Sequence, residues 1–109
     1  MILHRRTHKF RAEYLEEGIR LACELNRLAA EKMGKLGMVY HPAMLGSGLS
    51  RRHVIVDTYH ESLTAMDAYY SAFLAMAEVK ALLPRWAEVE EESWAENFVI
   101  LADARERAP

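Results

Sequence analysis

The residues of this chain best suited to chemistry are histidines and charged residues that alternate along two short segments. Three occupy every second position near the start of the chain, and two lie four residues apart farther along. Side chains two apart share one face of a β-strand, because successive side chains alternate. If the two segments are neighbouring strands, they predict one polar cluster of candidate catalytic residues: His4, Arg6, His8, His53 and Asp57.

Within such a cluster Arg6 can pair with Asp57, and a histidine can serve as an acid or a base. Histidine is suited to this role because its charge changes near neutral pH. A structural interpretation also stays open, in which these residues are solvent-facing strand positions or form a salt bridge within a dimer.

A metal site built from His4 and His8 alone is excluded by distance. Four residues along a strand span about 13 Å, whereas a metal ligand lies within about 2 Å of the ion. One of these histidines together with His53 on a neighbouring strand stays conceivable, but the sequence gives no reason to assign a metal.

The pattern of residues 52–77 predicts a buried strand followed by a tight turn and a helix. We expect the other elements to be arranged around this unit. Residues 53–59 are β-branched and aromatic, which suits a strand. Ser62 is placed to cap the helix by accepting a backbone N–H bond. An apolar stripe then recurs at steps of three and four: Leu63, Met66, Tyr70, Phe73 and Ala77.

The rest of the chain predicts elements that complete a sheet and its helical cover. Pro42 places its segment at a sheet edge, because proline cannot donate to a strand ladder. The Gly46-Ser47-Gly48 turn lacks the patterns of a phosphate-binding loop. The expected elements are a strand at 1–10, a helix at 11–35, a strand at 38–45, a helical extension at 79–86 bent by Pro84, an acidic solvated turn at 88–92 and a strand at 94–102.

Composition sets limits on what the protein does. The 109 residues predict a single domain at 1–109, and a net charge of −2 gives no electrostatic reason to expect nucleic acid or an anionic membrane as a partner. The chain holds no apolar run of the roughly 20 residues that span a bilayer, and its start has no secretory signal. Cys23 is the one cysteine, so we expect no internal disulfide and a cytoplasmic location.

The order β-α-β-β-α-β predicts an α+β ferredoxin-like sandwich, with a four-stranded antiparallel sheet and the helices on one face. Val54 and Val56 suit the covered face. The opposite face carries apolar and aromatic candidates for ligand binding: Met38, Tyr40, Ile55, Tyr59 and Phe98. Such a face needs a cover, and a second copy of the chain is the simplest one.

Several short motifs resemble the dimeric α+β barrel superfamily, and NIPSNAP-like domains within it. They are Tyr59 at a strand end, Glu61-Ser62-Leu63 opening a helix, and an aromatic residue before the last strand. The first strand of NIPSNAP-like domains often reads E-L-R-T-Y. Here it reads His4-Arg5-Arg6-Thr7-His8, so Arg6 and Thr7 match while two histidines replace the acid and the aromatic residue.

This resemblance implies a homodimer whose two sheets enclose a shared cavity, and relatives that include antibiotic-biosynthesis monooxygenases and small cyclases. Two functions stay open. The protein is an enzyme acting on an apolar or aromatic small molecule, by proton transfer or cofactor-free oxygenation, or it is a non-catalytic ligand-binding or structural homodimer. No cofactor is implied. An open cavity with convergent polar groups favours the enzyme.

Overall fold

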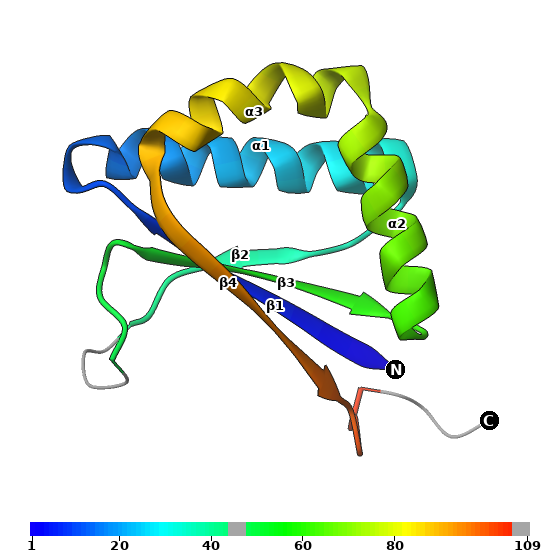
Figure 1. Cartoon of the computed structure of the whole chain (residues 1–109). Coiled ribbons are helices and arrows are strands. Elements are labelled where there is room, and N and C mark those ends of the chain that lie inside the picture. Colours follow the sequence, from blue (N-terminus) through cyan, green and yellow to red (C-terminus); the bar gives the residue numbers. More distant parts are fainter. Residues whose placement is uncertain (44–47, 106–109) are drawn as a thin grey trace.

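The computed structural model describes residues 1–43 and 48–105. Its elements are β1 (Ile2–Phe10), the 3-10 helix η1 (Ala12–Tyr14), α1 (Leu15–Met33), β2 (Met38–Tyr40), β3 (His53–His60), α2 (Leu63–Ala75), α3 (Ala77–Val89) and β4 (Glu90–Val99). The strands form one antiparallel sheet in the order β2-β3-β1-β4 (Figure 1). This confirms the predicted ferredoxin-like α+β fold.

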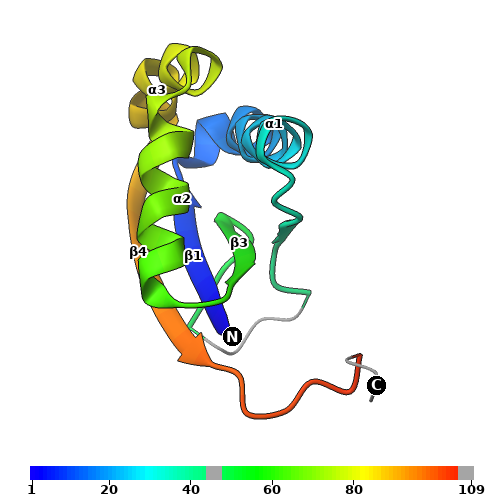
Figure 2. The ribbon, with the colours of Figure 1, turned by 90° about the vertical axis from the view of Figure 1, so that its right-hand side faces the viewer.

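The helices gather on one side of the sheet, as Figures 1 and 2 show together. α1 and α3 lie side by side, and α2 runs along one end of the sheet next to β3. Ser62 caps α2 as predicted, since its hydroxyl accepts a hydrogen bond of 3.1 Å from the backbone N–H of Ala65. In the described residues, none of the helices combines the length and the apolar character that crossing a bilayer requires.

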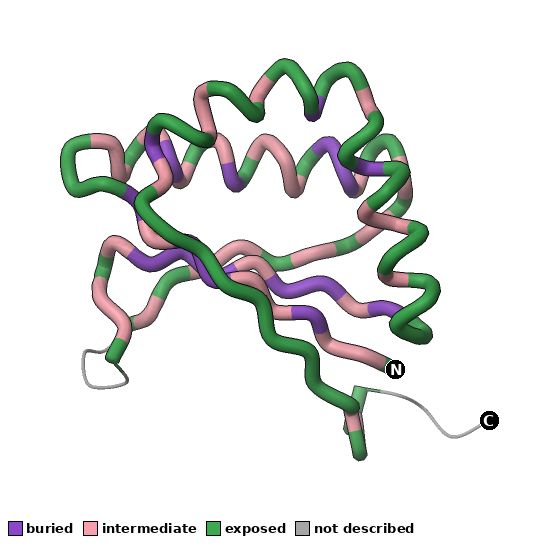
Figure 3. Tube along the Cα trace, viewed as in Figure 1, coloured by how far each residue is buried: buried purple, intermediate pink, exposed green. Residues whose placement is uncertain are grey.

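The helical segment after β3 is broken at Met76, a break that the sequence analysis did not predict. The backbone of Met76 is extended, with φ −67° and ψ 136°, and it separates α2 from α3. Pro84 lies inside α3. The two helices consequently run in clearly different directions, and the tube in Figure 3 shows the sharp turn between them.

The acidic run at 88–92 is not the predicted solvated turn. It contains the end of α3 and the start of β4, and Val89 within it is completely buried. Val89 packs in the core and thereby fixes the junction between α3 and β4, although the residues next to it are acidic. The predicted strand at 38–45 shortens to β2, which lies at the sheet edge as Pro42 indicated. Its predicted end at 44–45 and the first two residues of the predicted turn at 46–48 lie outside the described residues.

The strand register decides which side chains face the helices. On β1 the even-numbered residues face them, and on β3 Val54 and Val56 do so as predicted, opposite His8 and Arg6. The odd-numbered residues of both strands form the open face. Because successive side chains of a strand point to opposite faces of the sheet, consecutive residues of β1 lie in two different environments.

The buried core is divided into two clusters. The first joins the sheet to the helices and contains Phe10, Ala22, Val54 and Val89. Gly18 allows this contact, because a Cβ atom there would overlap the Phe10 ring. The second cluster lies entirely among the helices and contains Leu28, Ala29, Phe73 and Val79. The first cluster thus holds the helices to the sheet, and the second holds the helices to one another.

Phe73 is buried as the apolar stripe predicted, but it packs among helices rather than between a helix and the sheet. Its ring lies 5.7 Å from that of Tyr69, with the two ring planes nearly parallel. Leu63, another member of the stripe, is 53% exposed. We expect Phe73→Ala to lower the free energy of unfolding by about 3–5 kcal/mol, as deleting a core aromatic side chain does.

A urea titration measures this loss, with Leu63→Ala as the matched control on the same helix. The control should change the free energy of unfolding by less than about 0.5 kcal/mol, because it removes an exposed side chain. A loss below about 1 kcal/mol for Phe73→Ala would mean that the helical cluster does not hold the helices together.

Candidate functional site

A cavity of about 430 Å³ lies between the helices and the covered face of the sheet. Most of its wall is apolar and comes from α1, α2 and α3. The polar groups come chiefly from the sheet and from the tyrosines of α2. The side chains central to its chemistry are His4, Arg6, His8, Thr58, Tyr70 and Trp86.

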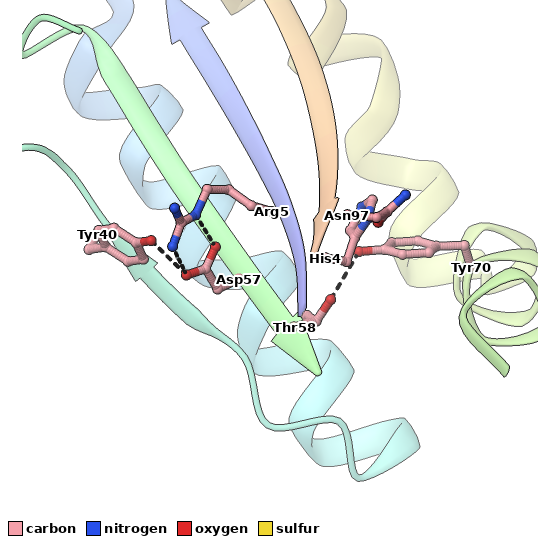
Figure 4. A network of polar contacts seen from close by, with 7 residues as sticks. All are labelled: His4, Arg5, Tyr40, Asp57, Thr58, Tyr70 and Asn97. Atoms are coloured by element: carbon pink, nitrogen blue, oxygen red, sulfur yellow. Dashed lines mark hydrogen bonds and ion pairs between the residues drawn. The ribbon is translucent and has the colours of Figure 1, made fainter. Parts of the chain in front are cut away.

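His4 is held in the cavity wall by a partner on β4. Its Nδ1 lies 2.6 Å from Oδ1 of Asn97, the residue directly opposite it in the sheet (Figure 4). Since an amide oxygen only accepts, we assign the proton of His4 to Nδ1. The buried Nε2 is left with a free lone pair and no protein partner among the described residues.

His8 is held in the same manner by a carboxylate. Its Nδ1 lies 2.5 Å from Oε1 of Glu90, and its ring meets the edge of Trp86 at 4.7 Å between centroids. A carboxylate accepting from Nδ1–H fixes the orientation and tautomer of an imidazole and leaves Nε2 able to take a proton. The chemistry available here is therefore proton abstraction by His8, with Glu90 as its positioning partner.

The pairing of His8 with Glu90 depends on an irregularity in the sheet. Between Lys9 and Phe10 the register with β4 shifts, so that Phe10 lies opposite Glu90. A β-bulge re-aims side chains by adding one residue to one strand. The sequence analysis missed Glu90 because it placed this residue in a turn.

Another polar group that faces the cavity is the hydroxyl of Tyr70, on α2. The Tyr70 hydroxyl lies 3.4 Å from Oγ1 of Thr58, and that oxygen lies 2.8 Å from Nε2 of His60. Burial raises the pKa of Tyr70, so its phenol stays protonated and can donate a hydrogen bond. Burial also lowers the pKa of His60 to about 4, with smaller contributions from the neighbouring Lys35 and His4.

Asp57 belongs to a different site on the open face. Arg5 donates to its two carboxylate oxygens at 3.0 and 3.1 Å, and the Tyr40 hydroxyl donates at 2.6 Å (Figure 4). Burial together with the Asp57 carboxylate raises the pKa of Tyr40 to about 12. The predicted pair of Arg6 with Asp57 is wrong, because the register places Arg5 opposite Asp57.

The predicted single cluster of five catalytic candidates is therefore split between the two faces of the sheet. His4, Arg6 and His8 line the cavity under the helices, whereas His53 and Asp57 lie on the open face. Nδ1 of His53 accepts from the backbone N–H of Ser50 at 2.8 Å, and its ring meets the edge of Trp94. Catalytic roles for these residues stay predictions.

The five ligand-binding candidates all lie where the sequence placed them. The register puts Met38, Tyr40, Ile55, Tyr59 and Phe98 on the open face. Among them Ile55 is buried by its neighbours, while Met38 is 48% and Phe98 is 41% exposed. A role in ligand binding stays a prediction for each. Over the described ranges, no group of three His, Cys, Asp or Glu side chains is arranged to hold a metal ion.

Comparison with known proteins gives matches of structure only. No protein-family model matches the sequence, and no curated protein matches it. A NIPSNAP domain protein from Burkholderia xenovorans superposes with a TM-score of 0.75 at 16% identity, covering 94% of this chain and 96% of the other. A NIPSNAP family protein from Agrobacterium tumefaciens gives 0.75 at 19% identity, covering 90% of each chain.

An antibiotic biosynthesis monooxygenase superposes with a TM-score of 0.70 at 12% identity, covering 94% of this chain and all of the other. This chain has the fold of NIPSNAP domains and antibiotic biosynthesis monooxygenases. The resemblance inferred from the sequence motifs is confirmed at the level of the fold. Identities below 20% carry no site residues from those proteins to this one.

Acid should destabilise the protein through His60. Its pKa is about 4 in the folded protein, whereas an unfolded histidine titrates near about 6.5. Between these values the unfolded chain binds more protons, so the free energy of unfolding falls as the pH drops from about 6.5 towards about 4. The full loss is on the order of 3 kcal/mol. The groups that face His60 are His4, Lys35, Tyr69 and Tyr70.

Urea titrations at pH 7.5 and pH 5 measure this loss, with His60→Gln as the comparison. The variant removes the titrating ring, so its free energy of unfolding should fall less over the same interval. An equal fall in both proteins would show that His60 is protonated as readily in the folded chain as in the unfolded one.

Proposed function

We propose that this protein binds an apolar or aromatic small molecule in the cavity between its helices and its sheet, and that His8 removes a proton from it. The observation that carries this proposal is the pair of anchored histidines. His4 and His8 each have Nδ1 fixed by an acceptor from β4, and each lines the cavity with Nε2 free of any protein partner among the described residues.

The cavity supports the proposal by its size and its wall. Small-molecule sites commonly have about 300–1,000 Å³, a largely apolar lining and a few fixed polar groups, and a volume of about 430 Å³ falls in this range. The Glu90 carboxylate at Nδ1 supports a basic role for His8, because it would stabilise the imidazolium that forms when Nε2 takes a proton. The sequence analysis expected the site between two sheets, and the proposed site lies instead inside each protomer.

5-Nitrobenzisoxazole tests the base directly. A base removes the proton from its ring carbon while the N–O bond breaks, which gives a nitrile and a coloured phenolate. A positioned general base typically contributes about 10²–10⁴-fold to a rate. We therefore expect His8→Gln to lower the rate of phenolate formation at least about tenfold, and Glu90→Gln to lower it less.

The control is His41→Gln, the same change at an exposed histidine outside the cavity. It should leave the rate unchanged. Equal rates for the parent protein and His8→Gln would overturn the role of His8 as base, and binding of the probe without turnover would favour the non-catalytic alternative.

We propose in addition that the protein is a homodimer joined through the open face of its sheet. Exposed apolar and aromatic side chains on this face support the proposal. Trp94 is 36% exposed, and Met38 and Phe98 are more so. A second copy would remove this surface from water, which is the main favourable contribution to such association. Arg5 lies 5.6 Å from the Phe98 ring and would lie within the same interface.

Phe98→Lys should weaken the dimer at least about tenfold, because burying an unpaired charge is costly. Ile55 is a poorer probe, since it is only 6% exposed within one protomer and a charge there would disturb the sheet itself. Light scattering over a concentration series measures the association. Leu36→Lys, at a 79% exposed position, is the matched control. A monomer at micromolar concentration would overturn this interface.

A further inference from the structure

Two consecutive arginines of β1 have opposite surroundings. Arg5 points to the open face, where it donates to both carboxylate oxygens of Asp57. Arg6 lines the cavity on the covered face and makes no hydrogen bond or ion pair with any described residue. The protein therefore neutralises one of the two charges internally and leaves the other without a partner.

The side chains around Arg6 explain why its charge is uncompensated. Its neighbours across the sheet are Val56 on β3 and Ala95 on β4, and neither can accept a hydrogen bond through its side chain. Glu90 is bound by His8, and Asp67 lines the cavity from α2 without forming an ion pair with Arg6.

Placing a guanidinium in a mainly apolar cavity is unfavourable unless an anion accompanies it. Arg6 is half-buried, whereas Arg20 and Arg51, which also form no ion pair with a described residue, are exposed to water. Water can satisfy the charge of an exposed arginine at little cost. At Arg6 the surroundings exclude part of that water, and no described carboxylate forms an ion pair with the guanidinium, so a bound anion would be stabilised there.

We infer that the ligand of this cavity carries a carboxylate, which Arg6 binds. This inference rests on the proposed function, since it names the chemical class of the small molecule in that cavity. A planar guanidinium matches a carboxylate with two parallel hydrogen bonds. Phosphate sites, in contrast, usually combine several donors, such as an arginine cluster or a helix N-terminus. Of the described residues that line this cavity, Arg6 alone is an arginine or a lysine.

The position of Arg6 also orients the rest of the ligand. His4 and His8 flank it two residues away on the same face, about 7 Å to either side at the rise of a strand. A carboxylate held at Arg6 would direct the apolar body of the ligand along the wall towards Trp86 and His8. The acidic hydrogen that His8 removes would then lie several bonds from the carboxylate, on the far side of that apolar body.

A pair of probes that differ only in charge tests this inference. 2-Naphthoate carries the carboxylate, and 2-naphthamide has the same aromatic body without the charge. Calorimetric titration should show that the protein binds 2-naphthoate at least about tenfold more tightly than 2-naphthamide. The reason is that hydrogen bonds between charged groups are stronger than those between neutral groups where little water is present. Arg6→Gln should reduce this preference to within about twofold, chiefly by lowering the affinity for 2-naphthoate.

Arg20→Gln is the matched control, because it removes the same charge from an exposed position on α1 and should keep the full preference. Arg6→Lys retains a charge but not the planar fork, and should retain only part of the preference. Circular dichroism of each variant verifies that it is folded before it is titrated.

The outcomes separate this inference from the proposed function. Binding of both probes with equal affinity, or a loss of preference in Arg20→Gln as large as in Arg6→Gln, would overturn the role of Arg6 and leave the cavity as a binding site. Failure of the protein to bind either probe would overturn both the cavity site and the carboxylate assignment.

Discussion

The structure depends on polar side chains that occupy positions where a sheet normally carries its core. His4, Arg6 and His8 stand on the covered face of the central strand, directly beneath the helices. Such groups cannot be packed as hydrocarbon would be, because burying a polar atom without a hydrogen-bond partner costs free energy. The apolar core is accordingly divided into two clusters, one around Phe10 and one around Phe73, and the cavity lies between them.

The side chains of β1 alternate between the two faces of the sheet, so this one strand contributes residues to two different sites. Arg5 and Arg6 are adjacent, yet one stabilises a charge network on the open face and the other faces the cavity. Shifting the register by one residue would exchange all these side chains between the faces. The network of Arg5, Asp57 and Tyr40 fixes this register, because its three hydrogen bonds join β1, β3 and β2.

A shared fold leaves the chemistry of this protein undetermined. NIPSNAP domains and an antibiotic biosynthesis monooxygenase superpose closely on the chain, but the sequence identities are 12–19%. The distinctive features are local ones: two histidines hydrogen-bonded to β4, a bulge that presents Glu90, and an arginine that forms no ion pair with a described residue. Function must be argued from these groups, since one fold supports many activities.

The sequence by itself determined the fold class, the two faces of β3 and the cap at Ser62, because periodicity and capping are local properties of the chain. It also identified His4, Arg6 and His8 as candidates. Only the tertiary structure decided that these three face the helices and are therefore separated from Asp57. The sequence pattern of the first strand has no clean apolar face, so alternation alone could not assign its sides. The bulge that brings Glu90 to His8 and the break at Met76 likewise depend on contacts between distant segments, which no local pattern encodes.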